Sequence, residues 1–542
     1  MKETVAQRVE RIKREKDPFS ILPDILRYAE TGFDSIPDED LNVRFRAWGL
    51  YTQGDGQGVR GKAVPRFMMR IRIPGGQLFA HQLHTIADLA DRYGQGVADV
   101  TDRQNIQLHH IRIEDVPDIF AALHRVGLTT MGACGDNTRN ITSCPLAGVD
   151  ATEICDASPL VQAANRLLNG NPAYSNLPRK FKVTITGCRH WCTYPEINDV
   201  GLVAREREVG GRREVGFDLL VGGGLATAPH LAVRIPAFVR WHEAVRVVEA
   251  IAAIFRDSDV LRQRRDKARL KFLFLEYGWD AERMLAEIEA RLGYPLEPPL
   301  PPLTPPEVHR DHVGIHPQRQ PGMVYVGLAT TTGRVTPAQL RAVADLAAEY
   351  GDGQIRLTPT QNIVILNVPS HRAAAVAERA AALGLPADAS PFRRCTVSCT
   401  GAQFCKLAIV ETKEFGAWLV AEMERRLPGF GEQVKLHVTG CPNSCGQHWI
   451  ADIGLLGVKV KDGAQQVDGF EIFVGGGLGA DPGFGRRTGL RVPAHRVPEA
   501  LERILRRAQA ERRPGESLKD VLRRTSDDAL RTWVSSEPST AD

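Results

Sequence analysis

The fold of this chain is decided by the stretch GGQLFAHQLHTIADLADRYGQGVADVTDRQNIQL, residues 75–108, because a second version of it occurs later. The second version is GRVTPAQLRAVADLAAEYGDGQIRLTPTQNIVI, residues 333–365. Each version has the pattern of a strand end, an amphipathic helix and a further strand. Matching residues are separated by a constant 257 positions, as in the pairs Gln82 and Gln339, Tyr93 and Tyr350, Gln104 and Gln361, and Asn105 and Asn362.

A cysteine pair and a glycine triplet also recur. TITGCRHWCTYPEINDVG (184–201) matches HVTGCPNSCGQHWIADIG (437–454), and GFDLLVGGGL (216–225) matches GFEIFVGGGLG (469–479). Landmarks in register over such distances predict an internal duplication with a pseudo-two-fold relation between the halves. We expect the glycine triplets to serve the fold, since both halves carry one and glycine permits close backbone approach.

Length and composition set the class of protein. A chain of 542 residues is too long for one hydrophobic core, so several domains are expected. The stretch PLEPPLPPLTPP (295–306) predicts a semi-rigid connector between the halves. No apolar stretch approaches the ~20 residues that span a bilayer, and the first residues are charged. We expect a cytoplasmic protein with no membrane partner, and the net charge of +4 gives no indication of nucleic-acid binding.

Two runs are rich in arginine, LRQRRDKARLK (261–271) and RILRRAQAERR (503–513). Each run suits a solvated helix face. Together they also suit a docking surface for an acidic protein partner.

Four cysteines of the second half form a C-x5-C … C-x3-C arrangement: Cys399, Cys405, Cys441 and Cys445. In a reducing compartment, such tight spacings indicate metal or redox chemistry and not disulfides. Zinc knuckles usually have shorter spacings, and a redox dithiol would have C-x2-C. Four thiolates from two loops are what an iron–sulfur cube requires. We therefore predict a [4Fe–4S] cluster, ahead of zinc and of disulfides.

SCTGAQFC (398–405) together with TGCPNSCG (439–446) resembles the signature of the siroheme and [4Fe–4S] nitrite and sulfite reductases. The resemblance runs from FRAWGLYTQ (45–53) to beyond FEIFVGGGLG (470–479), and it includes DHVGIHPQRQPGMVYVGL (311–328), LPRKFK (177–182) and KLAIVETK (406–413). It implies an internally duplicated α+β chain with two ferredoxin-like half-domains and two siroheme/Fe–S-binding α/β domains.

The resemblance also implies domain boundaries. They are an N-terminal extension (1–62), a first ferredoxin-like half-domain (63–132), a first siroheme/Fe–S-type domain (133–294), a proline-rich linker (295–315), a second ferredoxin-like half-domain (316–388), a second siroheme/[4Fe–4S]-binding domain (389–515) and a C-terminal tail (516–542).

Residue roles follow from the resemblance. Cys445 would bridge the cluster and the siroheme iron, with Cys399, Cys405 and Cys441 as the other cluster ligands. Arg103, Gln107 and Asn443 would contact siroheme. Because siroheme carries carboxylates and the substrate is itself an anion, the pocket must be cationic. The implied substrate-facing cations are Arg70, Arg139, Lys180 and Lys182. For any single arginine the alternative is a surface salt bridge.

The reaction implied is the six-electron reduction of nitrite to ammonia or of sulfite to sulfide. The tracts at 311–328 and VSCTGAQFC (397–405) are most similar to ferredoxin-dependent assimilatory nitrite reductases, so nitrite is the expected substrate. Lys182 departs from that pattern, because those enzymes commonly have asparagine there and sulfite reductases have lysine. Sulfite carries more negative charge, which an extra cation favours. Assimilatory sulfite reduction is therefore the alternative, and dual activity fits both.

The chain has no nicotinamide or flavin fingerprint, so its electrons are expected from a separate carrier, a small acidic ferredoxin. We expect a monomer. Two remoter readings are a precorrin-3B synthase-like oxygenase and an electron-transfer or scaffold protein that lost siroheme. The set of four cations argues against the oxygenase.

The first half keeps part of the cysteine pattern. Cys144, Cys188 and Cys192 match cluster cysteines, whereas Asp150 stands at the counterpart of Cys405, with Cys155 nearby. One hypothesis is that these cysteines are relics of the duplication, packed as small apolar residues. The other is a second metal site. Because GCRHWC lacks the Pro-Asn of the second copy, we expect relics.

Overall fold

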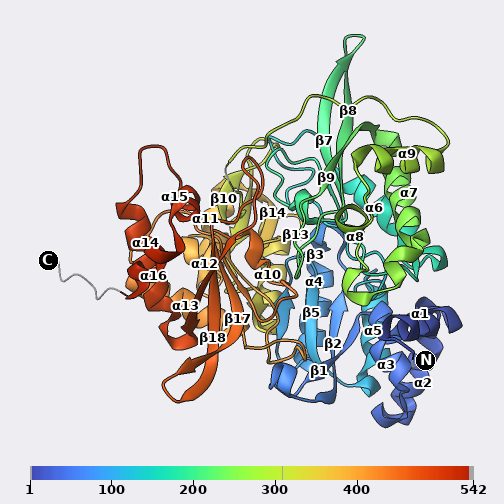
Figure 1. Ribbon diagram of the computed structural model, residues 1–542, viewed down its shortest axis with the longest axis horizontal. Helices are drawn as coiled ribbons and strands as arrows, with labels where there is room; N and C mark the ends of the chain where they lie inside the picture. The colour runs from blue at the N-terminus through green and yellow to red at the C-terminus, as the bar shows by residue number, and fades with distance from the viewer. Residues whose placement is uncertain (1–2, 308, 536–542) are drawn as a thin grey trace.

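The computed structural model describes residues 3–307 and 309–535. The two halves of the chain lie side by side, and each contributes two sheets (Figure 1). Short N-terminal helices pack beside the first half, and the helices that end the chain pack on the far side of the second (Figure 1). Among the described residues, no helix has the length and apolar character needed to cross a membrane.

Two antiparallel sheets of five strands form the centre of the molecule, with the orders β1-β2-β5-β4-β12 and β10-β11-β14-β13-β3. The strands of the first are β1 (Leu50–Gly54), β2 (Ala63–Ile71), β5 (Ile106–Ile111), β4 (Ala98–Val100) and β12 (Arg334–Val335). Those of the second are β10 (Gly314–Pro317), β11 (Met323–Leu328), β14 (Ile363–Pro369), β13 (Gln354–Leu357) and β3 (Gln77–Phe79).

Each central sheet receives its last strand from the other half of the chain. Strand β12 pairs with β4 through Arg334 and Asp99, and β3 pairs with β13 through Leu78 and Ile355. β3 and β12 occupy equivalent places in the repeat, so the exchange is reciprocal. The predicted duplicated α+β fold is confirmed.

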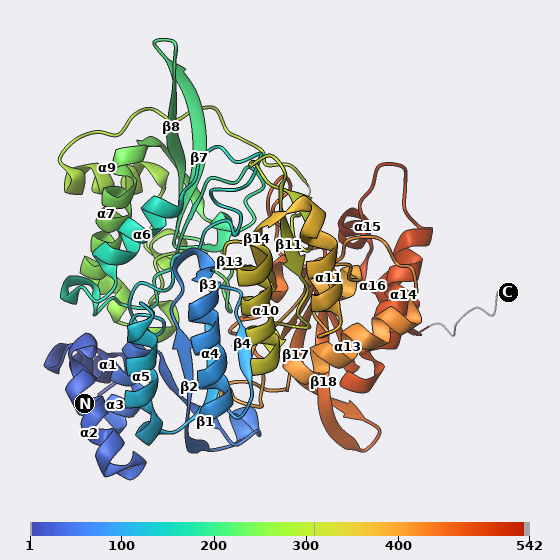
Figure 2. The same ribbon diagram turned by 180° about the vertical axis from the view of Figure 1, so that it is seen from behind.

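The repeated helices are α4 (Ala80–Arg92) and α10 (Pro337–Tyr350), which lie side by side (Figure 2). The repeated glutamines explain how both begin. The side-chain oxygen of Gln82 accepts a hydrogen bond from the Phe79 N–H at 3.0 Å, and that of Gln339 accepts from Thr336 at 2.9 Å. Both bonds satisfy donors that a helix start leaves unpaired. One hydrophobic core contains the buried faces of both helices and both sheets.

A second pair of glutamines fastens the halves together. Gln104 donates to the Leu357 carbonyl at 2.9 Å, and Gln361 donates to the Val100 carbonyl at 3.1 Å. Both glutamines have positive φ, 56° and 66°, which aims their side chains across the interface. The repeated Gln-Asn therefore marks the pseudo-two-fold contact.

The outer sheets carry the cysteine loops and have the orders β6-β7-β8-β9 and β15-β16-β17-β18-β19. The first comprises β6 (Val183–Thr186), β7 (Val200–Val209), β8 (Arg212–Val221) and β9 (Val233–Arg240). The second comprises β15 (Thr396–Ser398), β16 (Leu436–Thr439), β17 (Ile453–Asp462), β18 (Gln465–Val474) and β19 (Arg486–Pro493). The β7–β8 and β17–β18 hairpins project at opposite ends of the molecule (Figure 1).

Helices cover these sheets and build two further cores. The remaining α-helices are α1 (Val5–Glu15), α2 (Leu22–Thr31), α3 (Asp38–Asn42), α5 (Val116–Arg125), α6 (Ser158–Leu168), α7 (Ala244–Asp257), α8 (Phe272–Glu276), α9 (Ala281–Leu292), α11 (Ala373–Ala381), α12 (Pro391–Cys395), α13 (Lys413–Arg426), α14 (Val497–Ala510), α15 (Leu518–Arg524) and α16 (Asp527–Ser535).

The glycine triplets serve close packing, as expected. A Cβ atom on Gly223 would lie 2.4 Å from the Glu196 carbonyl oxygen, and one on Gly476 would lie 2.5 Å from that of Trp449. Each triplet thus lets its strand end pack against the turn that follows the cysteine pair of its own half.

Candidate functional site

The four cysteines of the second half lie at one edge of an outer sheet. Cys399 and Cys405 follow β15, and Cys441 and Cys445 follow β16. Because β15 and β16 run parallel, their carboxyl ends meet at the same edge and bring the two loops together. The Gly440 N–H donates to the sulfur of Cys399 at 3.2 Å, so the loops are in direct contact.

Burial shifts the pKa values of three of these four thiols. Burial raises the pKa of Cys399 to about 11 and that of Cys441 to about 12, and the nearby Cys445 adds to both shifts. Burial likewise raises the pKa of Cys405, so without a cation these three sulfurs stay protonated. Metal ligation would supply the positive charge that stabilises thiolates there. Cys445 is exposed, as a sulfur must be to reach a second group outside the cluster.

The predicted cations of the first half come from three segments. Arg70 lies on β2, Arg139 lies in the segment before α6, and Lys180 and Lys182 lead into β6. The Arg139 N–H donates to the Phe181 carbonyl at 2.8 Å, which fixes the second segment against the third.

Arg70 connects this group to the cysteine loops. It pairs directly with Gln107 across β2 and β5, and its guanidinium donates to the Gln107 side-chain oxygen at 3.1 and 2.5 Å. Gln107 in turn donates to the Thr400 hydroxyl at 3.4 Å, next to Cys399. Although burial alone would lower the pKa of Arg70, the charges of nearby groups raise it, that of Cys134 most and those of Asp102 and Cys445 less. The structure therefore brings Arg70, Gln107 and Cys445 together from opposite halves.

The cations form a group without acidic partners. None of its six members has a carboxylate oxygen within 4.0 Å among the described residues; they are Arg70, Arg72, Arg103, Arg139, Lys180 and Lys182. Arg72 and Arg103 donate to carbonyls and amides, and Arg139 donates to the Gly135 carbonyl at 3.0 Å. Unpaired positive charge is costly away from water, so this arrangement requires anions.

The lowered pKa values of Lys180 and Lys182 reflect their burial among other positive charges. Burial lowers the pKa of Lys182 to about 8, and Arg103 and Arg269 add to the effect. Burial also lowers the pKa of Lys180 well below its ordinary value, with Lys182 adding and Cys445 opposing. An anion bound among these side chains would favour their charged forms.

Three residues of this neighbourhood were missed by sequence reasoning. Arg72 is fully buried beside the predicted cations, with its pKa lowered to about 9 by burial. Arg269 donates to Asp199 at 2.7 Å, and Asp199 also accepts from the Lys182 N–H. No motif of the sequence analysis pointed to Arg72, and Arg269 lay within an arginine run that suited a solvated helix face.

That run, 261–271, is not the free docking surface that the sequence suggested. Arg262 pairs with Glu10 at 2.6 Å, Arg265 pairs with Asp136 at 2.8 Å, and Lys271 is buried. Several of its charges are therefore used inside the protein, whereas Arg264 is exposed and pairs with Asp266 of the same run.

Asn443 and Cys445 are both exposed in the loop after β16. In the same loop Gln447 donates to Asp102 at 2.8 Å, beside Arg103. This hydrogen bond joins the loop of the second half to the cationic side of the first. A cavity of about 390 Å³ beneath the N-terminal helices is lined by residues 135–137, just before Arg139.

The fold and this site together define an iron–sulfur protein with a four-cysteine centre beside an anion-binding group of cations. The family described as "Nitrite and sulphite reductase 4Fe-4S domain" matches residues 134–296 and 390–541. The family described as "Nitrite/Sulfite reductase ferredoxin-like half domain" matches residues 60–126 and 316–383. The chain belongs to the siroheme and [4Fe–4S] nitrite and sulfite reductases, which are ferredoxin-dependent oxidoreductases.

Similar proteins carry both activities in their names. The chain is 39% identical to "Sulfite reductase [ferredoxin] 1" of Mycolicibacterium paratuberculosis, covering 96% of this chain and 95% of that protein. It is 36% identical to "Ferredoxin--nitrite reductase" of Leptolyngbya laminosa, covering 93% and 97%. The solved structure of the Mycobacterium tuberculosis NirA protein superposes with a TM-score of 0.91 at 38% identity, covering 96% and 97%.

Proposed function

We propose that this chain reduces sulfite to sulfide in preference to nitrite, and that nitrite is its second substrate. Both activities occur in the family, and the tracts quoted above led us to expect nitrite first. The observation that supports sulfite as the preferred substrate is the group of six cations without acidic partners, which includes Lys182. A dianion gains more than a monoanion from each added positive charge.

The residues present fit the family's two cofactors. Cys399, Cys405, Cys441 and Cys445 would hold the cluster, and the exposed sulfur of Cys445 would also ligate the siroheme iron. When bound, these groups supply electrons and the iron at which the anion binds. Arg103, Gln107 and Asn443 would contact siroheme.

The chain's own cations would orient the anion and supply protons. Gln107 holds the guanidinium of Arg70, and the Gly135 carbonyl holds that of Arg139, so both are oriented before the anion arrives. Lys180 has a lowered pKa and can release a proton more readily than an ordinary lysine. Protons are needed because the oxygens of the substrate leave as water.

We also propose a cytoplasmic monomer, with the domain boundaries given by the sequence. Support for the monomer is that both halves of one chain supply the site, Arg70 from the first and Cys445 from the second.

Steady-state turnover with reduced ferredoxin tests the substrate order. We expect kcat/KM to be higher for sulfite than for nitrite at the same pH and ionic strength. A higher value for nitrite would refute the order. The extracted pigment distinguishes a siroheme reductase from an oxygenase or an electron-transfer protein, because protein matured with siroheme must release an iron isobacteriochlorin.

A further inference from the structure

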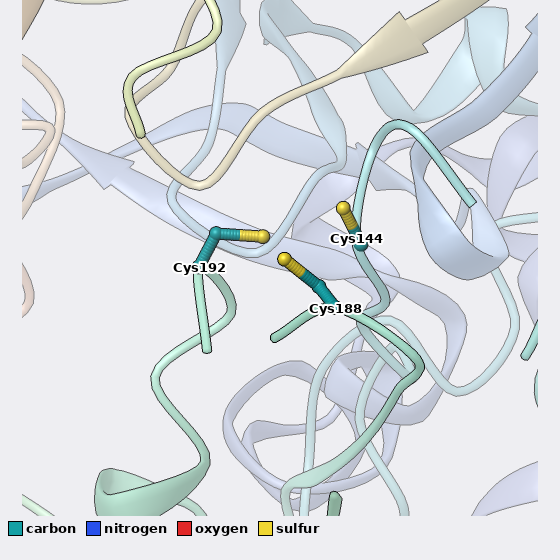
Figure 3. A group of neighbouring side chains, drawn as sticks. All are labelled: Cys144, Cys188 and Cys192. Carbon is teal, nitrogen blue, oxygen red and sulfur yellow. The ribbon is translucent and has the colours of Figure 1, made fainter. Parts of the chain in front are cut away.

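Three cysteines of the first half converge on one point. The sulfurs of Cys144, Cys188 and Cys192 all lie within 4.8 Å of one another, and all three residues are buried (Figure 3). Cys155, the fourth member of the hypothesised metal site, is not in this group. The hypothesis of a second metal site therefore does not extend to Cys155.

This group occupies the place that the [4Fe–4S] site has in the other half, but its sulfurs lie closer together. No three sulfurs among Cys399, Cys405, Cys441 and Cys445, all of them within the described residues, lie as close together as 4.8 Å. Ligands of a cube stand apart around it, whereas ligands of one ion converge. The spacing of the three sulfurs in the first half therefore suits a single metal ion and not a cluster.

The position that would supply a fourth cluster ligand is also occupied otherwise. Asp150, the counterpart of Cys405, forms an ion pair with Arg310 at 2.5 Å and accepts from the Thr152 N–H at 2.9 Å. Its carboxylate is committed to these partners. A second cluster therefore lacks both the space and the fourth ligand.

The spacing of the three sulfurs suits zinc. With Zn–S bonds of about 2.3 Å, tetrahedral thiolates stand about 3.8 Å apart. Three sulfurs within 4.8 Å need only small side-chain rotations to reach that geometry. Apolar side chains close the site from water: Leu146, Val149, Tyr325, Val364 and Leu366.

An imidazole is available for the fourth position. His190 lies between the two cysteines of the CRHWC loop, where its backbone N–H donates to the Cys188 sulfur at 3.4 Å and its side chain contributes to the lowered pKa of that thiol. Its Nδ1 is buried and has no hydrogen-bond partner among the described residues. His312 is a second buried imidazole whose ring nitrogens both lack such a partner, and Cys188 is among the groups that act on it. His190 is favoured because it shares the loop and touches the sulfur.

We propose that Cys144, Cys188 and Cys192, with His190 as the fourth ligand, bind one structural Zn²⁺ ion. The ion ties together two of the three segments that carry the anion-facing cations, those of Arg139 and Lys182. Arg139 lies five residues before Cys144, and Lys182 lies six residues before Cys188. The Ile185 N–H already donates to the Thr142 carbonyl at 3.1 Å. The ion would join the same two segments a few residues further along the chain, at Cys144 and Cys188.

Metal analysis of the purified holoenzyme, produced in zinc-containing medium, tests the site. We expect about one zinc per chain in the wild type and in Cys155→Ser, and at least a tenfold loss of zinc in Cys188→Ser. Iron content and siroheme absorbance should be the same in all three proteins. Zinc content depends on neither substrate nor turnover, so this test stands apart from the proposed sulfite activity.

Each other outcome overturns the proposal. Zinc below a tenth of an equivalent in the wild type means packed thiols only. Extra iron and acid-labile sulfide that vanish in Cys188→Ser mean a second cluster. If the count of free thiols is two too low and dithiothreitol restores it, the cysteines form a disulfide.

X-ray absorption at the zinc edge of the wild-type holoenzyme keeps the test valid if Cys188→Ser fails to fold. We expect three sulfur scatterers at about 2.3 Å and one nitrogen at about 2.0 Å. The nitrogen should be lost in His190→Ala and kept in His312→Ala. Any other sulfur count, or loss of the nitrogen in His312→Ala alone, refutes the ligand set.

Discussion

Replacing Lys182 with asparagine should change which anion the enzyme prefers. The structure makes this a clean change of charge. The Lys182 backbone N–H donates to Asp199 at 2.8 Å, and that bond does not depend on the side chain. No carboxylate among the described residues pairs with the ammonium group, so its removal leaves no acid without a partner.

The size of the effect follows from Coulomb's law. At ~6 Å and an effective dielectric constant of ~20, one positive charge contributes ~3 kcal/mol per unit of negative charge. A dianion loses about twice as much as a monoanion, so the ratio of kcat/KM for sulfite to that for nitrite should fall by up to about 100-fold. Screening and relaxation of the neighbouring cations reduce this, and we expect a fall of about 10- to 100-fold.

The assay is steady-state turnover of both anions at the same pH and ionic strength. Lys182→Arg keeps the charge and should hold the ratio within about threefold. Lys461→Asn, on the exposed β17–β18 hairpin, controls for loss of any lysine. Equal losses with sulfite and nitrite in Lys182→Asn would show that Lys182 does not distinguish the charges of the two anions.

Three further changes test the site and the fold. The kcat/KM for sulfite should fall as pH rises through about 8, because the charge of Lys182 is present below its lowered pKa and lost above it. Lys182→Arg should move this fall to higher pH. An unchanged pH profile in Lys182→Arg would contradict this role of Lys182. Gln361→Ala should lower the free energy of unfolding by about 1–3 kcal/mol in urea titration, since the Val100 carbonyl loses its donor, whereas exposed Gln466→Ala should change it little. Gly223→Ala should lower the melting temperature through the 2.4 Å clash with the Glu196 carbonyl, and an effect no larger than that of Gly431→Ala would contradict the packing role.

The duplication could be predicted because its landmarks are local in the sequence. Gln82 and Gln339 begin equivalent helices, and Gln104 and Gln361 reach across to equivalent carbonyls, so the same offset recurs wherever the fold needs the same contact. The exchange of β3 and β12 between the sheets could not be predicted. It depends on pairing between segments more than 200 residues apart, for which the sequence carries no periodic signal.

The same limit applies to the site. Motif residues such as Arg70 and Cys445 could be assigned through the family signature, yet their meeting across the two halves appears only in three dimensions. Arg269 lay within a run that suited a solvated helix face, although it forms a buried ion pair with Asp199 beside Lys182. Burial, which composition does not show, decides whether an arginine run faces solvent or the interior.

We propose that Cys445 joins the cluster to the siroheme iron, beside cations that come from the other half of the chain. Mössbauer spectroscopy of the oxidised, ⁵⁷Fe-enriched holoenzyme tests it most directly, because a shared thiolate couples the spins of the two centres. We expect the cluster irons to show magnetic splitting induced by the siroheme iron. A diamagnetic cluster beside an independent paramagnetic siroheme would contradict it.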